Sequence, residues 1–160
     1  MHHRWIRMAA CLGLTLFAQC VGAQPTVLPC KLSQPSCRPG FGVYLTYRWD
    51  AVPMDRDFKV FVHMRAADGR IVLQDDHTPP GGTAVWSGRI EYERTIVLPP
   101  TMPDGEYDIM LGMYDPRNGG GRQPLTAGPG VASGKSDPAA YKVGVLNVDA
   151  RQVGSKFDQI

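Results

Sequence analysis

The sequence predicts an all-β fold, an immunoglobulin-like antiparallel β-sandwich of six to eight strands. Apolar and polar residues alternate along several short segments, which is the period of two that a half-buried strand requires. Eighteen Gly and 14 Pro in 160 residues are enough to divide the chain into many short elements. The sequence contains no amphipathic segment of useful helical length. Short strands separated at regular intervals by Gly/Pro turns are typical of a sandwich.

Residues 1–23 are expected to form a signal peptide. A basic start is followed by an apolar run at 8–17 and by small residues that end at Ala23. The run is shorter than the roughly 20 apolar residues of a membrane-spanning helix, and no later stretch approaches that length. The mature chain is therefore expected to be periplasmic or secreted, with no transmembrane segment.

The four cysteines divide between the signal and the mature chain. Cleavage after Ala23 removes Cys11 and Cys20; in the alternative, a lipoprotein signal, Cys20 is kept as the lipidated residue. Cys30 and Cys37 remain, and in an oxidising compartment they are predicted to pair. Closing this short loop stabilises a fold by roughly 2.5 kcal/mol if the disulfide acts by restricting the unfolded chain.

The charge of the mature chain excludes two classes of partner. The full chain has 17 basic and 15 acidic side chains, and residues 1–23 carry two arginines and no acid. The mature chain therefore has 15 of each, a net charge of zero. Without a basic excess, neither a nucleic acid nor an anionic membrane surface is an expected partner.

The mature chain is predicted to hold one sandwich domain at 41–149, between an irregular, Pro-rich lead-in at 24–40 and a polar tail at 150–160. Its predicted strands, in chain order, are 43–49, 58–65, 71–75, 90–98, 106–114, a short one at 122–125, and 141–148. The residues predicted to face the core on the three clearest strands are Val43, Leu45, Tyr47, Trp49, Phe58, Val60, Val62, Met64, Tyr107, Ile109, Leu111 and Met113.

A hairpin is predicted around Asp68-Gly69, because Gly tolerates the positive φ that tight hairpin turns use. With the turn centred there, His63 is expected opposite Gln74, and Arg65 near Val72.

Several marks occur in a fixed order along the chain: FKVFVHMRAADGRIVLQDDHTPP at 58–80, Trp86, LPPTMPDGEYDIMLGMYDPRNGG at 98–120, and the RQPL that follows. In this order they resemble the small accessory β-sandwich domain found C-terminal to bacterial membrane glycosyltransferases of the dolichyl-phosphate-mannose-protein mannosyltransferase type and in other envelope proteins. The resemblance implies a non-catalytic domain in the cell envelope. The transferase part of those enzymes has no counterpart in this sequence, so the resemblance does not name a ligand.

Two histidines follow the signal peptide, and both lie on or just beyond the predicted hairpin. His63, Asp75, Asp76 and His77 form a candidate site for a divalent metal, since imidazole and carboxylate ligands suit zinc, copper or manganese. In the alternative, the two aspartates cap loop amides and His77 pairs with one of them, which makes a purely structural corner. The structural interpretation is favoured, because the accessory domain has the same corner, and no cofactor is then required.

Catalysis is not predicted, because the sequence has no nucleophile elbow, phosphate loop or zinc-protease motif. Trp86, Tyr92 and Tyr114 are a candidate aromatic platform for a sugar ring, whose C–H face packs on aromatic faces. The alternative role for Trp86 is a lid over the open end of the core. The sequence thus favours an exported, non-catalytic binding module for an envelope glycan or protein, with Asp75, Asp76 and His77 as further candidate binding residues.

Overall fold

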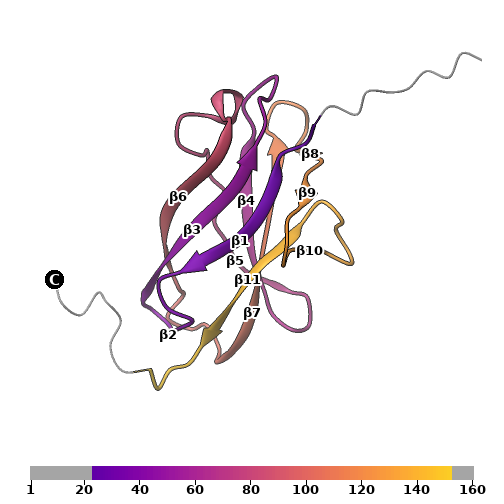
Figure 1. Ribbon diagram of the computed structural model, residues 1–160. Helices are drawn as coiled ribbons and strands as arrows, with labels where there is room; N and C mark the ends of the chain where they lie inside the picture. Colours follow the sequence, from indigo (N-terminus) through magenta and orange to yellow (C-terminus); the bar gives the residue numbers. More distant parts are fainter. Residues whose placement is uncertain (1–22, 153–160) are drawn as a thin grey trace, which may run out of the picture.

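Two β-sheets pack face to face across one apolar core (Figure 1). The computed structural model describes residues 23–152, so the predictions for 1–22, including Cys11 and Cys20, and for 153–160 lie outside the described residues. In chain order the elements are β1 (Thr26–Leu32), β2 (Ser36–Cys37), β3 (Gly42–Ala51), β4 (Lys59–Arg65), β5 (Ile71–Gln74), the 3-10 turn η1 (Thr83–Val85), β6 (Gly88–Val97), β7 (Gly105–Asp115), β8 (Gly121–Gln123), β9 (Thr126–Ala127), β10 (Ala132–Ser133) and β11 (Tyr141–Val148).

One sheet has the order β6-β3-β1-β9, and the other has the order β10-β11-β7-β4-β5, with β2 beside β11 and β8 beside β7. All neighbours are antiparallel except the short pairs β1–β9 and β2–β11. The predicted all-β sandwich of immunoglobulin-like class is therefore confirmed. The seven strands of four residues or more match the predicted number, and the other four described strands have two or three residues.

The core consists of the side chains that the two sheets turn toward each other. Every residue predicted to face inward on the strands at 43–49, 58–65 and 106–114 is buried. The largest of them are Trp49 and Tyr47 on β3. Burying a large apolar side chain contributes about 1.5–3 kcal/mol, so this alternation is the main stabilising feature of the sandwich.

The lead-in at 24–40 is more regular than the sequence predicts, because it contains β1 and β2. Val27 and Leu28 of β1 are buried and pair with β3. The register then shifts between Leu28 and Lys31, at a bulge that contains Pro29. A proline has no N–H to donate to a ladder, so it fits at a bulge without breaking the strand.

The β4–β5 hairpin follows the prediction except at one position. Gly69 has a φ of 84°, and the amide of Arg70 donates to the Asp68 carboxylate at 2.9 Å. His63 lies opposite Gln74, as predicted. Arg65 lies opposite Ile71 and not beside Val72, because the register shifts between Met64 and Arg65.

Cys30 and Cys37 are separate thiols in the structure, so the predicted disulfide is not formed. Cys37 lies beside Val148 of β11, whereas the sulfur of Cys30 lies 2.8 Å from the place where a Cβ on Gly144 would be. Gly144 and Val148 are four residues apart on β11, a separation of about 13 Å along the strand. A disulfide needs the two Cα atoms within about 7 Å of each other. Cys30 on β1 and Cys37 on β2 therefore lie at different levels of the sandwich, which keeps them apart.

The outer face of β4, the side that points away from the main core, is also largely buried. Phe61 and His63 point away from the main core, yet both are buried. Phe61, Met110 and Ala140 form a second small apolar cluster there, against the segment that joins β10 to β11. Gly112 allows this contact, since a Cβ at that position would meet the Phe61 ring and, at 2.5 Å, the carbonyl of Ala139.

Candidate functional site

The corner at Asp75–His77 divides its side chains between the two faces of the sheet. His77 points inward and is buried: its Nδ1 lies 2.8 Å from the backbone carbonyl of Asp75, and its Nε2 lies 2.9 Å from the hydroxyl of Tyr92. Because a carbonyl only accepts, Nδ1 donates to the backbone carbonyl of Asp75, and Nε2 is left to share a hydrogen bond with the Tyr92 hydroxyl. The imidazole also stacks on Tyr47, with ring centroids 5.5 Å apart.

Arg94 completes the inward part of the corner. It lies on the edge strand β6, and its Nε and Nη2 donate to the two carboxylate oxygens of Asp75, each at 2.7 Å. Burial tends to raise the pKa of Asp75, but hydrogen bonds from Arg94 and His77 outweigh it and hold that pKa well below its usual range. The corner is thus an ionised, internally satisfied structure.

His63 occupies the opposite, outer face. Its Nε2 lies 3.0 Å from the side-chain amide nitrogen of Gln74, and Asp76 approaches no closer than 3.9 Å. The ring packs against Phe61 with centroids 4.9 Å apart. Burial lowers the pKa of His63, with Asp76 acting in the opposite direction.

The four predicted metal ligands are therefore not brought together. Asp75 and His77 face the interior, while His63 and Asp76 face the outer side, because alternate residues of a strand point to opposite faces. Over residues 23–152, no three side chains of His, Cys, Asp or Glu are grouped so that they could hold a metal ion.

The predicted aromatic platform is not assembled either. Trp86 is only 4% exposed, packs against Trp49 and Tyr92, and donates its indole N–H to the carbonyl of Pro80 at 3.4 Å. Tyr114 lies on the other side of the second sheet, against the Phe61 cluster. Trp86 closes the core, which is the lid that the sequence offered as the alternative.

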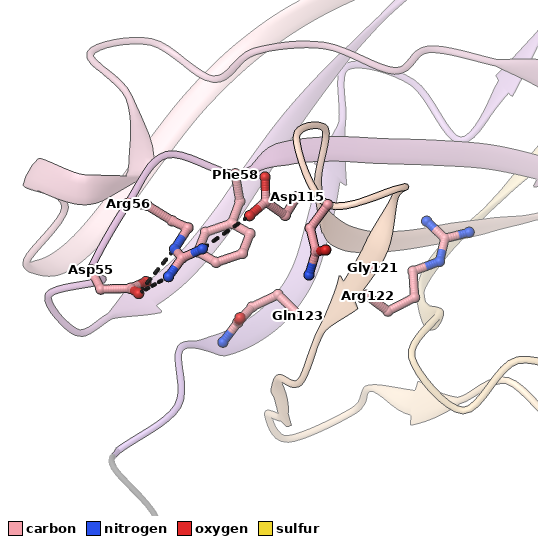
Figure 2. A pocket seen from close by; sticks show the side chains of 8 residues that line it. Asp55, Arg56, Phe58, Asp115, Gly121, Arg122 and Gln123 are labelled. Atoms are coloured by element: carbon pink, nitrogen blue, oxygen red, sulfur yellow. Dashed lines mark hydrogen bonds and ion pairs between the residues drawn. The ribbon is translucent and has the colours of Figure 1, made fainter.

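A polar cavity of about 230 Å³ lies at one end of the sandwich (Figure 2). The Arg56 guanidinium bridges Asp55, at 2.6 Å, and Asp115, at 3.3 Å. Figure 2 shows Gln123 turned toward these groups and Arg122 turned away. Because Arg56, Asp55 and Asp115 already pair with one another, this cavity leaves few charged groups free to bind a ligand.

A larger cavity, of about 460 Å³, lies between the β4–β5 hairpin and the segment around β10. We call it the cationic cavity, after the three cationic side chains in its lining, Arg65, Lys135 and Lys142. Its apolar lining comes from Met110 and from alanines 66, 67 and 132. Its position on the outer face of the second sheet follows from the strands in Figure 1 that supply it, β4, β7, β10 and β11.

Of the three cations that line the cationic cavity, Lys142 is paired with a carboxylate, whereas Arg65 and Lys135 have no such partner among residues 23–152. Asp108, the single carboxylate in the lining, lies 2.5 Å from the Lys142 ammonium. Arg65 makes one long hydrogen bond, from Nη1 to the Ser136 hydroxyl at 3.4 Å, and its buried Nε has no hydrogen-bond partner. Arg65 and Lys135 thus have no acidic partner within the described chain, which makes this cavity the best candidate for a binding site.

The fold and the site define an immunoglobulin-like β-sandwich with a cationic cavity on the outer face of one sheet. No known protein family and no curated protein matches the chain. Among solved structures, it is similar to the crystal structure of a Niemann-Pick type C2 protein from the Japanese carpenter ant, with 8% sequence identity and a TM-score of 0.46 over 81% of this chain and 96% of that chain. We draw no functional conclusion from a similarity of this size.

Sequence reasoning missed the residues of the cationic cavity. The alternation along 58–65 puts Arg65 on the face of its strand opposite the predicted core residues, but no pattern in the sequence indicates that the segment around β10 covers it. Lys135 within this segment and Lys142 just after it are a signal that would have placed positive charge near it. Their distance from Arg65 in sequence, about 70 residues, concealed the cluster.

No helix within residues 23–152 has the length and apolar character needed to cross a membrane.

Proposed function

We propose that the chain is a non-catalytic binding module of the cell envelope that holds a sugar residue of a glycan in the cationic cavity. The observation that carries the proposal is the cavity itself, about 460 Å³ in volume, within the usual range for small-ligand sites. The envelope setting rests on the signal peptide expected at 1–23.

The lining suits a sugar because it has both polar and apolar parts. Met110 and Ala132 offer apolar surface to the C–H face of a ring, and the side chains of Arg65, Lys135 and Ser136 offer hydrogen bonds to its substituents. The glycan therefore does not need an exposed aromatic residue, which the buried Trp86 does not supply.

A binding role is favoured over glycoside hydrolysis. Most glycosidases use two carboxylates on either side of the scissile bond, one as an acid and the other as a base or nucleophile. The cavity lining contains one carboxylate, Asp108, and its partner is Lys142 at 2.5 Å.

The test is an NMR titration of the isotopically labelled mature chain with a panel of neutral and acidic oligosaccharides. We expect the amide signals of Ala66, Ala132 and Ser133 to shift with saturation. In Ala132→Trp, a variant that fills the cavity without changing its charge, these shifts should disappear. Shifts confined to the cavity at Arg56, or no shift with any glycan, would contradict the proposal.

A further inference from the structure

The cationic cavity carries more positive charge than its own side chains neutralise. Three cations, Arg65, Lys135 and Lys142, line it together with a single carboxylate, Asp108. Even when Lys142 and Asp108 are counted as a neutral pair, two positive charges remain. An uncharged ligand would leave this excess uncompensated in a partly enclosed site, where charges interact more strongly than in water.

The position of Asp108 is informative. In the β4–β7 ladder its Cα lies directly opposite that of Arg65, so the two side chains start as neighbours on one face. The carboxylate nevertheless contacts Lys142 of β11, at 2.5 Å. Within residues 23–152, the one hydrogen bond from the Arg65 side chain goes to Ser136. Asp108 thus pairs with the lysine and leaves the guanidinium without a counter-ion.

Arg65 has the geometry of an incomplete anion site. Its Nε is buried and has no hydrogen-bond partner, and its Nη1 makes a long contact of 3.4 Å. Buried donors without a partner are rare and costly in folded proteins. A guanidinium presents parallel N–H groups whose spacing matches the two oxygens of a carboxylate or phosphate. An oxyanion would therefore compensate the excess charge and accept hydrogen bonds from the parts of the guanidinium that line the cavity.

We infer that the group recognised in the cationic cavity is an oxyanion, a carboxylate or phosphate, with Arg65 as its main ligand and Lys135 and Lys142 as secondary cations. This inference rests on the proposed glycan-binding function and narrows it to acidic sugars. The apolar lining at Ala132 and Met110 would contact the body of the ligand, and the cations would bind its charged group.

The experiment is isothermal titration calorimetry of the mature chain with glucuronate, with glucose as the neutral match, and with inorganic phosphate as the anion alone. We expect glucuronate to bind at least about tenfold more tightly than glucose, because charge-assisted hydrogen bonds are roughly twice as strong as neutral ones. The affinity should fall as salt is raised. Arg65→Gln should abolish the preference for glucuronate, and Arg65→Lys should restore it only in part.

The control is Arg89→Gln, which removes an exposed arginine paired with Asp50 on the other sheet and should leave binding unchanged. Circular dichroism of each variant shows that the fold is intact. Equal binding of glucose and glucuronate, unaffected by Arg65→Gln, would overturn the oxyanion inference and leave the glycan proposal standing. Phosphate binding as tight as glucuronate would support the oxyanion site and overturn the glycan function. Binding of none of the three would overturn both.

Discussion

Arg94 donates two parallel hydrogen bonds of 2.7 Å to Asp75, and through them the edge strand β6 of one sheet is joined to the end of β5 in the other. A charged side chain that points inward from an edge strand also discourages that edge from pairing with another chain. Asp75 therefore contributes to holding the two sheets together.

We expect Asp75→Asn to lower the free energy of unfolding by about 1–2 kcal/mol, because it leaves Arg94 without its ionic partner in a half-buried position. Asp50→Asn is the matched control, since it breaks the exposed pair with Arg89, and it should cost no more than about 0.5 kcal/mol. Urea unfolding followed by circular dichroism measures both. Equal effects of the two substitutions would mean that the Asp75 pair is no stronger than a surface pair.

The same pair predicts how stability changes in acid. The pKa of Asp75 in the folded state lies below its ordinary value of 3.8, so its contribution is present above about pH 4 and is lost as the pH falls below it. Asp75→Asn should flatten the stability curve in that range and leave its slope near pH 7 unchanged. A wild-type curve that the substitution does not flatten below pH 4 would contradict this prediction.

His63 predicts a second loss of stability on acidification, which begins at a higher pH than the loss due to Asp75. Burial lowers its pKa below the ordinary 6.5, so the folded state binds fewer protons than the unfolded state, and stability falls as the pH drops below about 6.5. His63→Leu should remove this part of the pH dependence. An NMR titration of the His63 ring provides the direct check, and a pKa at or above 6.5 would show that the prediction is wrong.

Trp86 is expected to matter for stability and not for ligand binding. Trp86→Ala should lower the free energy of unfolding by about 3 kcal/mol, because it removes a buried indole from the core. The neighbouring Val85 is 74% exposed, so Val85→Ala should change stability by no more than about 0.5 kcal/mol. If thermal and urea unfolding give the same result for both variants, Trp86 does not close the core.

Gly112 is expected to tolerate no side chain. A Cβ there would lie 2.5 Å from the carbonyl of Ala139 and would also meet the Phe61 ring, so Gly112→Ala should cost about 1–3 kcal/mol. Gly121→Ala is the control, because the nearest atom to its Cβ would be 3.5 Å away. A Gly112→Ala variant that unfolds at the same urea concentration as Gly121→Ala would contradict the close packing of this segment on β7.

The two cysteines should titrate as thiols. Burial raises the pKa of Cys30 to about 11, and it also raises the pKa of Cys37, so neither thiolate is populated at neutral pH. We expect a maleimide reagent to modify neither residue in the native protein and both after unfolding without a reductant. A mass two hydrogens lower, with no thiol after unfolding, would show that they form a disulfide.

The strands and their inward faces could be predicted from the sequence because alternation is a local property of a strand. The periods at Val43–Trp49 and Tyr107–Met113, and the pairing of His63 with Gln74 across an Asp-Gly turn, depend on residues close together in the chain. The same alternation already implies that Asp75 and Asp76 point to opposite faces. The strand in the Pro-rich lead-in was missed, because its pairing partner β3 and its bulge are not visible locally.

Only the tertiary structure decided where the site lies. Asp75 meets Arg94 19 residues away, and Arg65 meets Ser136 71 residues away. Whether a charged group is neutralised or left free depends on such contacts between distant segments, and no pattern along the chain encodes it. The sequence thus determined the sandwich and the faces of its strands. The packing of the β10–β11 segment on the second sheet decided that Arg65 lies in a cavity without a counter-ion, because charge compensation is a property of three-dimensional proximity.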